Sequence, residues 1–365
     1  MAYKVLDLFS GAGGLSRGFM DAGYEVVLGV DFDDAALKTF KENHGHSEAM
    51  KLDLFDHSNI YKITDWLQQN NCKIDVLVGG PPCQGFSVAG PRNMNDKRNS
   101  LYLAMVKLAD ILKPQAVVLE NVPGMIRVND GVGAKRIVKD FAEIGYKMVP
   151  KLLYAPDYGV PQIRKRVFFV GLRDTDVEFG FPEAIVDRGH YVTCEEAIGD
   201  LPSLQTSNGE IIYGEDIQEY LFAPSNDYQR IMRRNSQTIH NHIGSIPIEK
   251  TRKMISMVPE GKNYKSLPEE YSKLYKYHEA LTRYHSQRPS LTINTGHRSH
   301  FHYKWNRIPT VRESARLQSF PDDFIFYGNK SEQYRQVGNA VPPMLGKAVA
   351  AELLFYMKER DDEEV

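Results

Sequence analysis

A cysteine in a stiff, polar turn offers the clearest chemistry in the sequence. Cys83 lies in the segment GGPPCQGFS, residues 79–87, directly after the apolar run Asp75–Val78, which we expect to form a short buried strand. Two glycines end that strand and two prolines stiffen the chain beyond it. Because ligands of open α/β sheets bind beyond such strand ends, the pattern indicates a thiolate nucleophile. A lone cysteine is more often buried and inert, but the polar, glycine-containing loop favours the reactive alternative.

Two more segments carry side chains suited to the same site. Glu120 ends a predicted strand and is the next carboxylate at a strand end after Cys83. A carboxyl group there can hydrogen-bond a ring nitrogen and an exocyclic amine of a heterocycle, and can shift a proton toward the ring. In the segment QIRKR, residues 162–166, the glutamine and both arginines share one face, where buried guanidinium groups need an anion or a polar partner. The structural alternative for Glu120 is an acid that caps the following helix, and the alternative for residues 162–166 is a solvated edge strand.

A glycine-rich turn near the N-terminus indicates a nucleoside cofactor. The segment DLFSGAGGL, residues 7–15, is typical of a strand, a turn and a helix start, where glycines let a ligand approach the backbone. Asp31 follows Gly13 by 18 residues, at the end of a second predicted strand, where it could bind a ribose hydroxyl. Ser16 occupies the third glycine position of the dinucleotide fingerprint, which fits a cofactor without a pyrophosphate better than NAD. The alternative is a tight structural turn.

The elements that position these residues alternate at βαβ spacing in the first half of the chain. We expect strands at 4–9, 25–30, 51–54, 76–78, 116–119, 146–154 and 167–172, and helices at 15–22, 33–43, 60–69, 101–112 and 133–144. This predicts an α/β fold with a doubly wound, mostly parallel sheet and helices on both faces. Beyond about Phe181 the periodicity weakens. There we expect helices at Glu269–Tyr284 and Pro343–Lys358, and a frayed acidic end at Glu359–Val365.

The net charge of −2 conceals a basic segment. Residues Asp227–Arg312 hold 16 Lys and Arg against 6 Asp and Glu, and 7 of the 11 histidines. This indicates a polyanionic partner for that segment or, equally, a solvated charged face. The three cysteines lack metal-type spacing, which predicts a reducing cytoplasm and no metal site. The start is unlike a signal peptide and no apolar run could span a membrane, so we expect a cytoplasmic protein.

Six motifs in a fixed order reveal a family resemblance. They are FSGAGG (9–14), GGPPCQGFS (79–87), ENV (120–122), QIRKR (162–166), RESARLQ (312–318) and GNAVPP (338–343). Taken singly, the last two have no assignable function. Together they resemble the DNA (cytosine-5) methyltransferases of the bacterial restriction–modification type, over nearly the whole chain.

The resemblance implies S-adenosylmethionine as cofactor and a Rossmann-like methyltransferase domain with a smaller target-recognition domain. Residues 1–181 and 335–365 would form the catalytic domain, 182–304 the target-recognition domain and 305–334 a hinge segment. The C-terminal helix would return beside the first strand. The implied cofactor contacts are Phe9, Gly11, Gly13, Leu15, Asp31, Phe32, Asp53, Leu54, Pro82, Leu101, Asn339 and Val341.

The resemblance also implies a reaction. Cys83 would add to C6 of a cytosine flipped out of a specific double-stranded DNA sequence. Glu120 would bond N3 and the 4-amino group, Arg166 would hold O2, and Arg164 would organise the loop and a phosphate. The loop Gly85–Asn99 would close over the base. The implied DNA contacts are Gln84, Ser87, Arg98 and Gln162.

The implied partners are few. The resemblance points to double-stranded DNA as substrate and allows a cognate restriction endonuclease that acts on the same site. The lack of an obvious dimer surface leads us to expect a monomer.

Three alternatives share some of these features. A tRNA cytosine-5 methyltransferase uses the same scaffold, although GFS after the cysteine and the long variable region resemble the DNA enzymes more. A catalytically silent, S-adenosylmethionine-binding DNA regulator would have no chemical need for Cys83, Glu120 and Arg166 together. An NAD-dependent oxidoreductase is opposed by Ser16 and by the cysteine loop.

Overall fold

The chain folds into two compact units. The computed structural model describes residues 2–82, 101–205, 210–275, 280–296 and 299–363. The first unit comprises Met1–Tyr154, Lys165–Glu183 and Pro343–Val365, and the second comprises Ala155–Arg164 and Ala184–Pro342. The division of catalysis and target recognition between domains stays a prediction.

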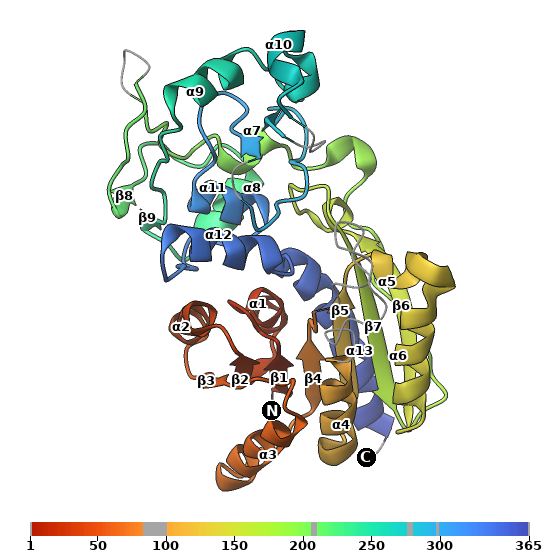
Figure 1. The fold of residues 1–365 in the computed structure, drawn as a ribbon. Helices are drawn as coiled ribbons and strands as arrows, with labels where there is room; N and C mark the ends of the chain where they lie inside the picture. The colour runs from red at the N-terminus through yellow and green to blue at the C-terminus, as the bar shows by residue number, and fades with distance from the viewer. Residues whose placement is uncertain (1, 83–100, 206–209, 276–279, 297–298, 364–365) are drawn as a thin grey trace. The chain divides into compact units, whose positions relative to one another are not determined.

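The first unit is built on a seven-stranded sheet with the order β3-β2-β1-β4-β5-β7-β6 (Figure 1). Its strands are β1 (Lys4–Leu8), β2 (Glu25–Asp31), β3 (Glu48–Lys51), β4 (Val76–Gly79), β5 (Ala116–Asn121), β6 (Tyr146–Tyr154) and β7 (Lys165–Arg173). The first five pair in parallel, whereas β7 runs antiparallel to β5 and β6. The predicted doubly wound, mostly parallel sheet is confirmed. Strand order changes direction between β1 and β4, and ligands bind at such switch points.

Helices cover this sheet because its strands are apolar on both faces. They are α1 (Gly14–Asp21), α2 (Asp34–Asn43), α3 (Ile60–Gln69), α4 (Tyr102–Leu112), α5 (Gly124–Arg127), α6 (Val132–Ala142) and α13 (Pro343–Glu363). The C-terminal helix α13 packs closely on α1, since a Cβ on Gly18 would lie 2.6 Å from the backbone nitrogen of Lys347. The end of the chain was predicted to fray at Glu359, but α13 continues to Glu363.

The third strand lies three residues earlier than predicted. The apolar residues Leu52 and Leu54 suggested a strand at 51–54, but β3 ends at Lys51. Both leucines are buried in the apolar core after the strand has ended. The Leu52 amide still donates to the Asp31 carbonyl of β2 at 2.9 Å, so pairing with β2 continues one residue past the end of β3.

The second unit has short elements and many connecting segments. They are α7 (Cys194–Ile198), β8 (Ile217–Glu219), α8 (Asp227–Arg233), β9 (Thr238–His240), α9 (Glu249–Ser256), α10 (Glu269–Ser272), β10 (Thr282–Arg283), β11 (His300–Phe301), α11 (Val311–Leu317) and α12 (Lys330–Asn339). The helix predicted over Glu269–Tyr284 is wrong, because α10 ends at Ser272 and β10 begins at Thr282. The extended chain at β10 lets the buried Arg283 guanidinium donate to the carbonyls of Ile255 and Val258.

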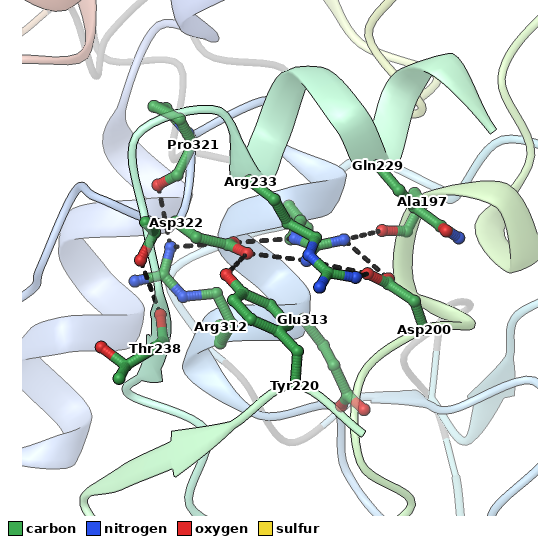
Figure 2. Close-up of polar contacts among 12 residues, drawn as sticks. Ala197, Asp200, Tyr220, Gln229, Arg233, Thr238, Arg312, Glu313, Pro321 and Asp322 are labelled. Atoms are coloured by element: carbon green, nitrogen blue, oxygen red, sulfur yellow. Dashed lines mark hydrogen bonds and ion pairs between the residues drawn. The ribbon is translucent and has the colours of Figure 1, made fainter. Parts of the chain in front are cut away.

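Charged side chains form part of the core of the second unit (Figure 2). Arg312 and Arg316 of α11 are fully buried. Arg316 donates to Asp200 at 2.8 Å and to Asp322 at 2.7 Å, and the Tyr220 hydroxyl donates to Asp322 at 2.5 Å. Arg312 donates to backbone carbonyls, including that of Phe324 at 2.7 Å. The arginines of the RESARLQ motif therefore hold this unit together.

Candidate active site

Glu120 and Arg166 meet at the ends of neighbouring strands. Strands β5 and β7 run antiparallel, so that the C-terminal end of β5 lies beside the start of β7. Arg166 Nε lies 2.6 Å from Glu120 Oε1, and the side chains are only 14% and 11% exposed. Burial lowers the pKa of Arg166, and the carboxylate opposes that shift. An arginine side chain stays protonated, so the two groups form a charge-assisted pair.

The peptide that leads into the predicted nucleophile is attached to the same strand ends. Strands β4 and β5 pair in parallel up to Gly79 and Leu119. Beyond them, the Asn121 amide donates to the carbonyl of Pro81 at 3.1 Å, and a Cβ on Gly80 would lie 3.3 Å from Glu120 Oε2. Gly80 and Pro81 therefore lie against Glu120 and Asn121, and the described chain stops at Pro82, one residue before the cysteine.

Several predicted residues lie outside the part of the chain that the structure describes. They are Cys83, Gln84, Ser87 and Arg98, together with the expected lid Gly85–Asn99. Their roles stay predictions.

The glycine turn after β1 is closed by a carboxylate from the next strand. Asp31 Oδ2 accepts a 2.8 Å hydrogen bond from the Gly11 amide, and Oδ1 accepts from the amides of Phe32 and Asp33 at 2.7 and 3.0 Å. Gly11 and Gly13 have φ angles of +53° and +90°, which favour glycine. Burial raises the pKa of Asp31, and the three amides oppose this. The carboxylate thus shapes the turn.

Ser16 explains why the dinucleotide fingerprint is incomplete. It is fully buried, and its hydroxyl donates to Asp7 Oδ2 at 2.6 Å, which ties the start of α1 to β1. Burial raises the pKa of Asp7 to about 7 despite this hydrogen bond. No role was expected for Asp7 from the sequence. The available signal was an acid between the apolar residues Leu6 and Leu8, four residues before the first glycine of the turn.

The other predicted cofactor residues of the first unit differ in how they are placed. Phe32 is exposed, with 66% of its surface accessible, and Asp53 accepts from the Phe55 amide at 2.9 Å. Leu54 and Leu101 lie in the apolar core. The remaining members are Phe9, with a φ of +58°, the buried Leu15 and the half-buried Pro82.

Gln162 and Arg164 are buried inside the second unit. Arg164 is 1% exposed and donates to the carbonyls of Ile293, Gly338 and Ala340 at 3.0, 2.9 and 3.1 Å. Gln162 accepts from the Ile293 amide at 3.0 Å. The solvated alternative is therefore excluded for Arg164, whose polar partners are backbone carbonyls. The predicted roles of these two residues toward DNA stay predictions.

Two predicted cofactor contacts belong to this second unit as well. Asn339 is exposed at the end of α12, and Val341 is buried. Their contacts with a cofactor stay predictions.

Charge in the basic segment divides between core and surface. Arg283, Arg307 and Arg312 are buried. The following lysines are exposed: Lys250, Lys253, Lys262, Lys265 and Lys273. A groove of about 260 Å³ in this unit is lined by Gln205, Ile211, Arg252, Lys253, Ser256 and Asn306. Cationic and amide side chains of this kind can contact phosphates and base edges.

Within the described ranges, no group of three or more His, Cys, Asp or Glu side chains could hold a metal ion. None of the helices in the described part of the chain has the length and apolar character needed to cross a membrane.

Comparisons with known proteins agree on one family. The family model described as C-5 cytosine-specific DNA methylase matches residues 3–354. The Type II methyltransferase M1.HphI of Haemophilus parahaemolyticus is 35% identical, over 97% of this chain and 87% of its own. The Type II methyltransferase M.DdeI of Desulfomicrobium norvegicum is 34% identical, over 97% and 89%. A crystal structure of a DNA modification methyltransferase encoded within an E. coli prophage has a TM-score of 0.79 and 26% identity, over 98% of this chain and 100% of its own.

Proposed function

The chain is a C-5 cytosine-specific DNA methylase of the Type II restriction–modification class, and we propose that it acts through covalent addition of Cys83 to C6 of a flipped-out cytosine in a specific double-stranded DNA sequence. The observation that supports this proposal most is the contact between Glu120 and Arg166. The pair lies at the strand ends to which the peptide before Cys83 is attached. A carboxylate and a guanidinium are thus held together at the strand ends from which the chain continues to the proposed nucleophile.

The pair fits the needs of the reaction. Cytosine C5 is a poor nucleophile, and addition of a thiolate at C6 turns the ring into an enamine that can attack a methyl sulfonium. Glu120 holds N3 and the 4-amino group while Arg166 holds O2, so both act where charge changes during addition. After methyl transfer, loss of the C5 proton lets the C6–S bond break and returns Cys83. Because a free thiol ionises near about pH 8.5, the site must favour the thiolate.

The cytosine has to leave the DNA duplex before Cys83 can reach it. Flipping a nucleotide costs roughly a few kcal/mol in lost stacking and pairing. Contacts between the second unit and the DNA backbone would offset this cost. The exposed lysines of the basic segment support that role, and the groove beside Arg252 and Asn306 has the side-chain types that read base edges.

The first unit has a cradle that fits S-adenosylmethionine. Among the described residues, no atom apart from those of its chain neighbours lies within 4 Å of a Cβ built on Gly11. Helix α1 begins after Gly13 without a side-chain cap, which leaves its N-terminus suited to a carboxylate. Asp31 would bind the ribose hydroxyls, Phe32 would offer its exposed ring to the adenine, and Asp53 would accept from the adenine amine. When bound, S-adenosylmethionine supplies an electrophilic methyl group.

A labelling experiment tests the reaction and its substrate. The purified protein is given S-adenosylmethionine with a labelled methyl group, with plasmid DNA and tRNA in separate reactions. We expect label only in 5-methyldeoxycytidine. Label in tRNA alone would keep the mechanism but reject DNA as the substrate, and no label despite cofactor binding would favour a silent regulator.

A trapping experiment tests the covalent step. DNA that carries 5-fluorocytosine at the modified site should form an adduct stable to denaturation, because fluorine at C5 cannot leave as the proton does. Cys83→Ser should give no adduct and no methylation while still binding DNA. Cys72→Ser is the matched control, since this half-buried cysteine lies between α3 and β4, before the start of the strand whose other end leads to Cys83. Wild-type turnover by Cys83→Ser would reject the mechanism.

Two further proposals concern partners. We propose a monomer, to be tested by sedimentation. A cognate endonuclease would share the recognition site, so plasmid methylated by this enzyme should resist an endonuclease that cuts there.

A further inference from the structure

A buried histidine contacts the glycine turn of the first unit. His44 follows α2 directly and is 1% exposed. Its Nε2 lies 3.1 Å from the carbonyl oxygen of Gly13, and its Nδ1 lies 2.7 Å from that of Phe40. No role was expected for His44 from the sequence. Its ring now bridges the end of α2 and the residue from which α1 begins.

The turn is packed directly on this ring. A Cβ on Gly13 would lie 2.2 Å from His44 Cε1 and 2.8 Å from Phe40 Cδ2. The His44 and Phe40 rings stack with centroids 4.2 Å apart and an angle of 12°. Phe40 in turn covers Gly29 of β2, where a Cβ would lie 2.4 Å from Phe40 Cζ. An unbroken column of close contacts therefore connects the interior of β2 with the turn.

The Gly13 peptide is fixed by this column. The Gly13 carbonyl also accepts the Arg17 amide at 2.8 Å, as the first hydrogen bond of α1. In a trans peptide the carbonyl and the following N–H point in opposite directions. A neutral imidazole has one N–H, and in the tautomer with the proton on Nε2 His44 donates to the Gly13 carbonyl. Holding this carbonyl between His44 and α1 therefore sets the direction of the Gly14 N–H, the first amide of the helix. At a helix N-terminus, such an amide is a donor for an anionic ligand group.

We propose that His44 is a positioning residue for the cofactor, which fixes the Gly13–Gly14 peptide so that its N–H meets the carboxylate of the methionine part. The inference rests on the proposed use of S-adenosylmethionine. Asp31 holds the Gly11 amide on one side of the turn, and His44 holds the Gly13 carbonyl on the other. Neither contact involves the reacting methyl group, so the effect belongs to cofactor binding and not to the chemical step.

Two substitutions separate this role from simple packing. His44→Phe keeps an aromatic ring that can stack on Phe40 but removes both ring nitrogens. His44→Gln restores a side-chain donor without the ring. His46→Phe is the matched control, because His46 is exposed and stands two residues away.

Calorimetry with S-adenosylmethionine and with S-adenosylhomocysteine gives the main readout. We expect the Kd of both ligands to rise about five- to tenfold in His44→Phe, as for the loss of one hydrogen bond. His44→Gln should recover part of that loss, and His46→Phe should match the wild type. Because both ligands carry the same carboxylate, they should be weakened equally.

Steady-state kinetics and exchange provide the second readout. In His44→Phe the KM for S-adenosylmethionine should rise while kcat and the Kd for DNA stay unchanged, and amide exchange should increase at Gly14. Unchanged Kd values in a folded His44→Phe would overturn the inference, as would a loss of kcat with Kd intact. Failure of the wild type to bind S-adenosylmethionine would instead overturn the proposed function.

Discussion

Arg166 Nε contacts Glu120 Oε1 at 2.6 Å across the antiparallel strands β7 and β5. Both side chains are largely buried, so each limits the freedom of the other. For catalysis, this means that the groups proposed to hold N3 and O2 of cytosine are already aligned by the sheet. Such preorganisation is worth more than an equal contact formed only when substrate arrives.

Replacing Glu120 tests this arrangement. Glu120→Gln keeps the size of the side chain but removes the charge and the proton-transfer group, so single-turnover methyl transfer should slow by about 10²- to 10⁴-fold. The Kd for S-adenosylmethionine, measured by calorimetry, should change less than twofold. Glu143→Gln, at an exposed position after α6, is the control. Equal losses in rate and cofactor affinity would remove the proposed role of Glu120.

The buried ion pairs of α11 should dominate the stability of the second unit. Asp322→Asn leaves Arg316 with a weakened partner in a fully buried site, and removal of one member of a buried pair costs about 3–5 kcal/mol. Arg230→Ala breaks the surface pair with Asp227 and should have no measurable effect. Urea unfolding gives both values.

The two tryptophans allow the units to be followed separately in that experiment. Trp66 lies in the first unit and Trp305 in the second. In a Trp66→Phe background, the fluorescence of Trp305 should report an earlier transition for Asp322→Asn. A transition that stays at the wild-type midpoint would show that the pair contributes little.

Hydrophobic patterning predicted the centre of the sheet because β4 and most of β5 are continuous apolar runs, whereas it misplaced the edge strand β3, whose sequence is EAMK. The same patterning failed at Glu269–Tyr284, where Tyr271 and Tyr275 pack on an apolar cluster from a short helix and a turn. The secondary structure of that region depends on contacts between residues distant in sequence, which a local hydrophobic pattern does not show.

The sequence suggested site residues only within recognisable motifs. It did not indicate residues whose role depends on being buried against the site. Asp7 and His44 look like ordinary polar residues in the sequence, and only packing shows that they hold the glycine turn. Charge counting likewise included Arg283, Arg307 and Arg312, which lie in the core. Composition gives the number of charges in a segment but not which of them reach solvent.

Acid should destabilise the second unit through two buried histidines. His242 bonds Thr310 Oγ1 and the Pro202 carbonyl, and His302 lies 3.5 Å from Glu313, which also pairs with Arg307. Burial lowers the pKa of His242 to about 4 and that of His302 to about 3.

The sign of the pH effect follows from these pKa values. In the unfolded chain each histidine takes a proton near about pH 6.5, whereas in the folded chain it stays neutral to much lower pH. The unfolded state therefore binds more protons, and stability falls as pH drops below about 6.5, by about 1.4 kcal/mol per pH unit for each histidine. Burial acts to raise the pKa of Glu313, but the Arg307 guanidinium outweighs this and keeps the pKa below its ordinary value. Further folding stability is therefore lost at still lower pH, where the Glu313 carboxylate takes up a proton.

Denaturant midpoints of the Trp305 transition between pH 7.5 and 5 measure this slope. His242→Gln removes one histidine that protonates on unfolding, so stability should fall less steeply with decreasing pH than in the wild type. This comparison of slopes holds even if the variant has a lower midpoint at pH 7.5. His190→Gln, at an exposed position, should leave the slope unchanged. An unaltered slope in His242→Gln would show that this histidine is protonated in the folded state as well.

The exposed lysines of the second unit should set the salt dependence of DNA binding. A quadruple variant that replaces Lys250, Lys253, Lys262 and Lys265 with glutamine removes cations from α9 and the segment after it. The logarithm of the binding constant falls linearly with the logarithm of the salt concentration, and each lost phosphate contact makes this slope less steep by about 0.9. Binding should weaken for cognate and unrelated DNA alike, because phosphates carry no sequence information.

Fluorescence anisotropy at several salt concentrations gives that slope. Lys135 and Lys139 are exposed on α6 of the first unit, so their replacement by glutamine changes the net charge at a different surface. This control should shift affinity slightly without changing the slope. If the control and the quadruple variant had equal slopes, the DNA would not contact these four lysines, and the basic segment would be a solvated face instead of a recognition surface.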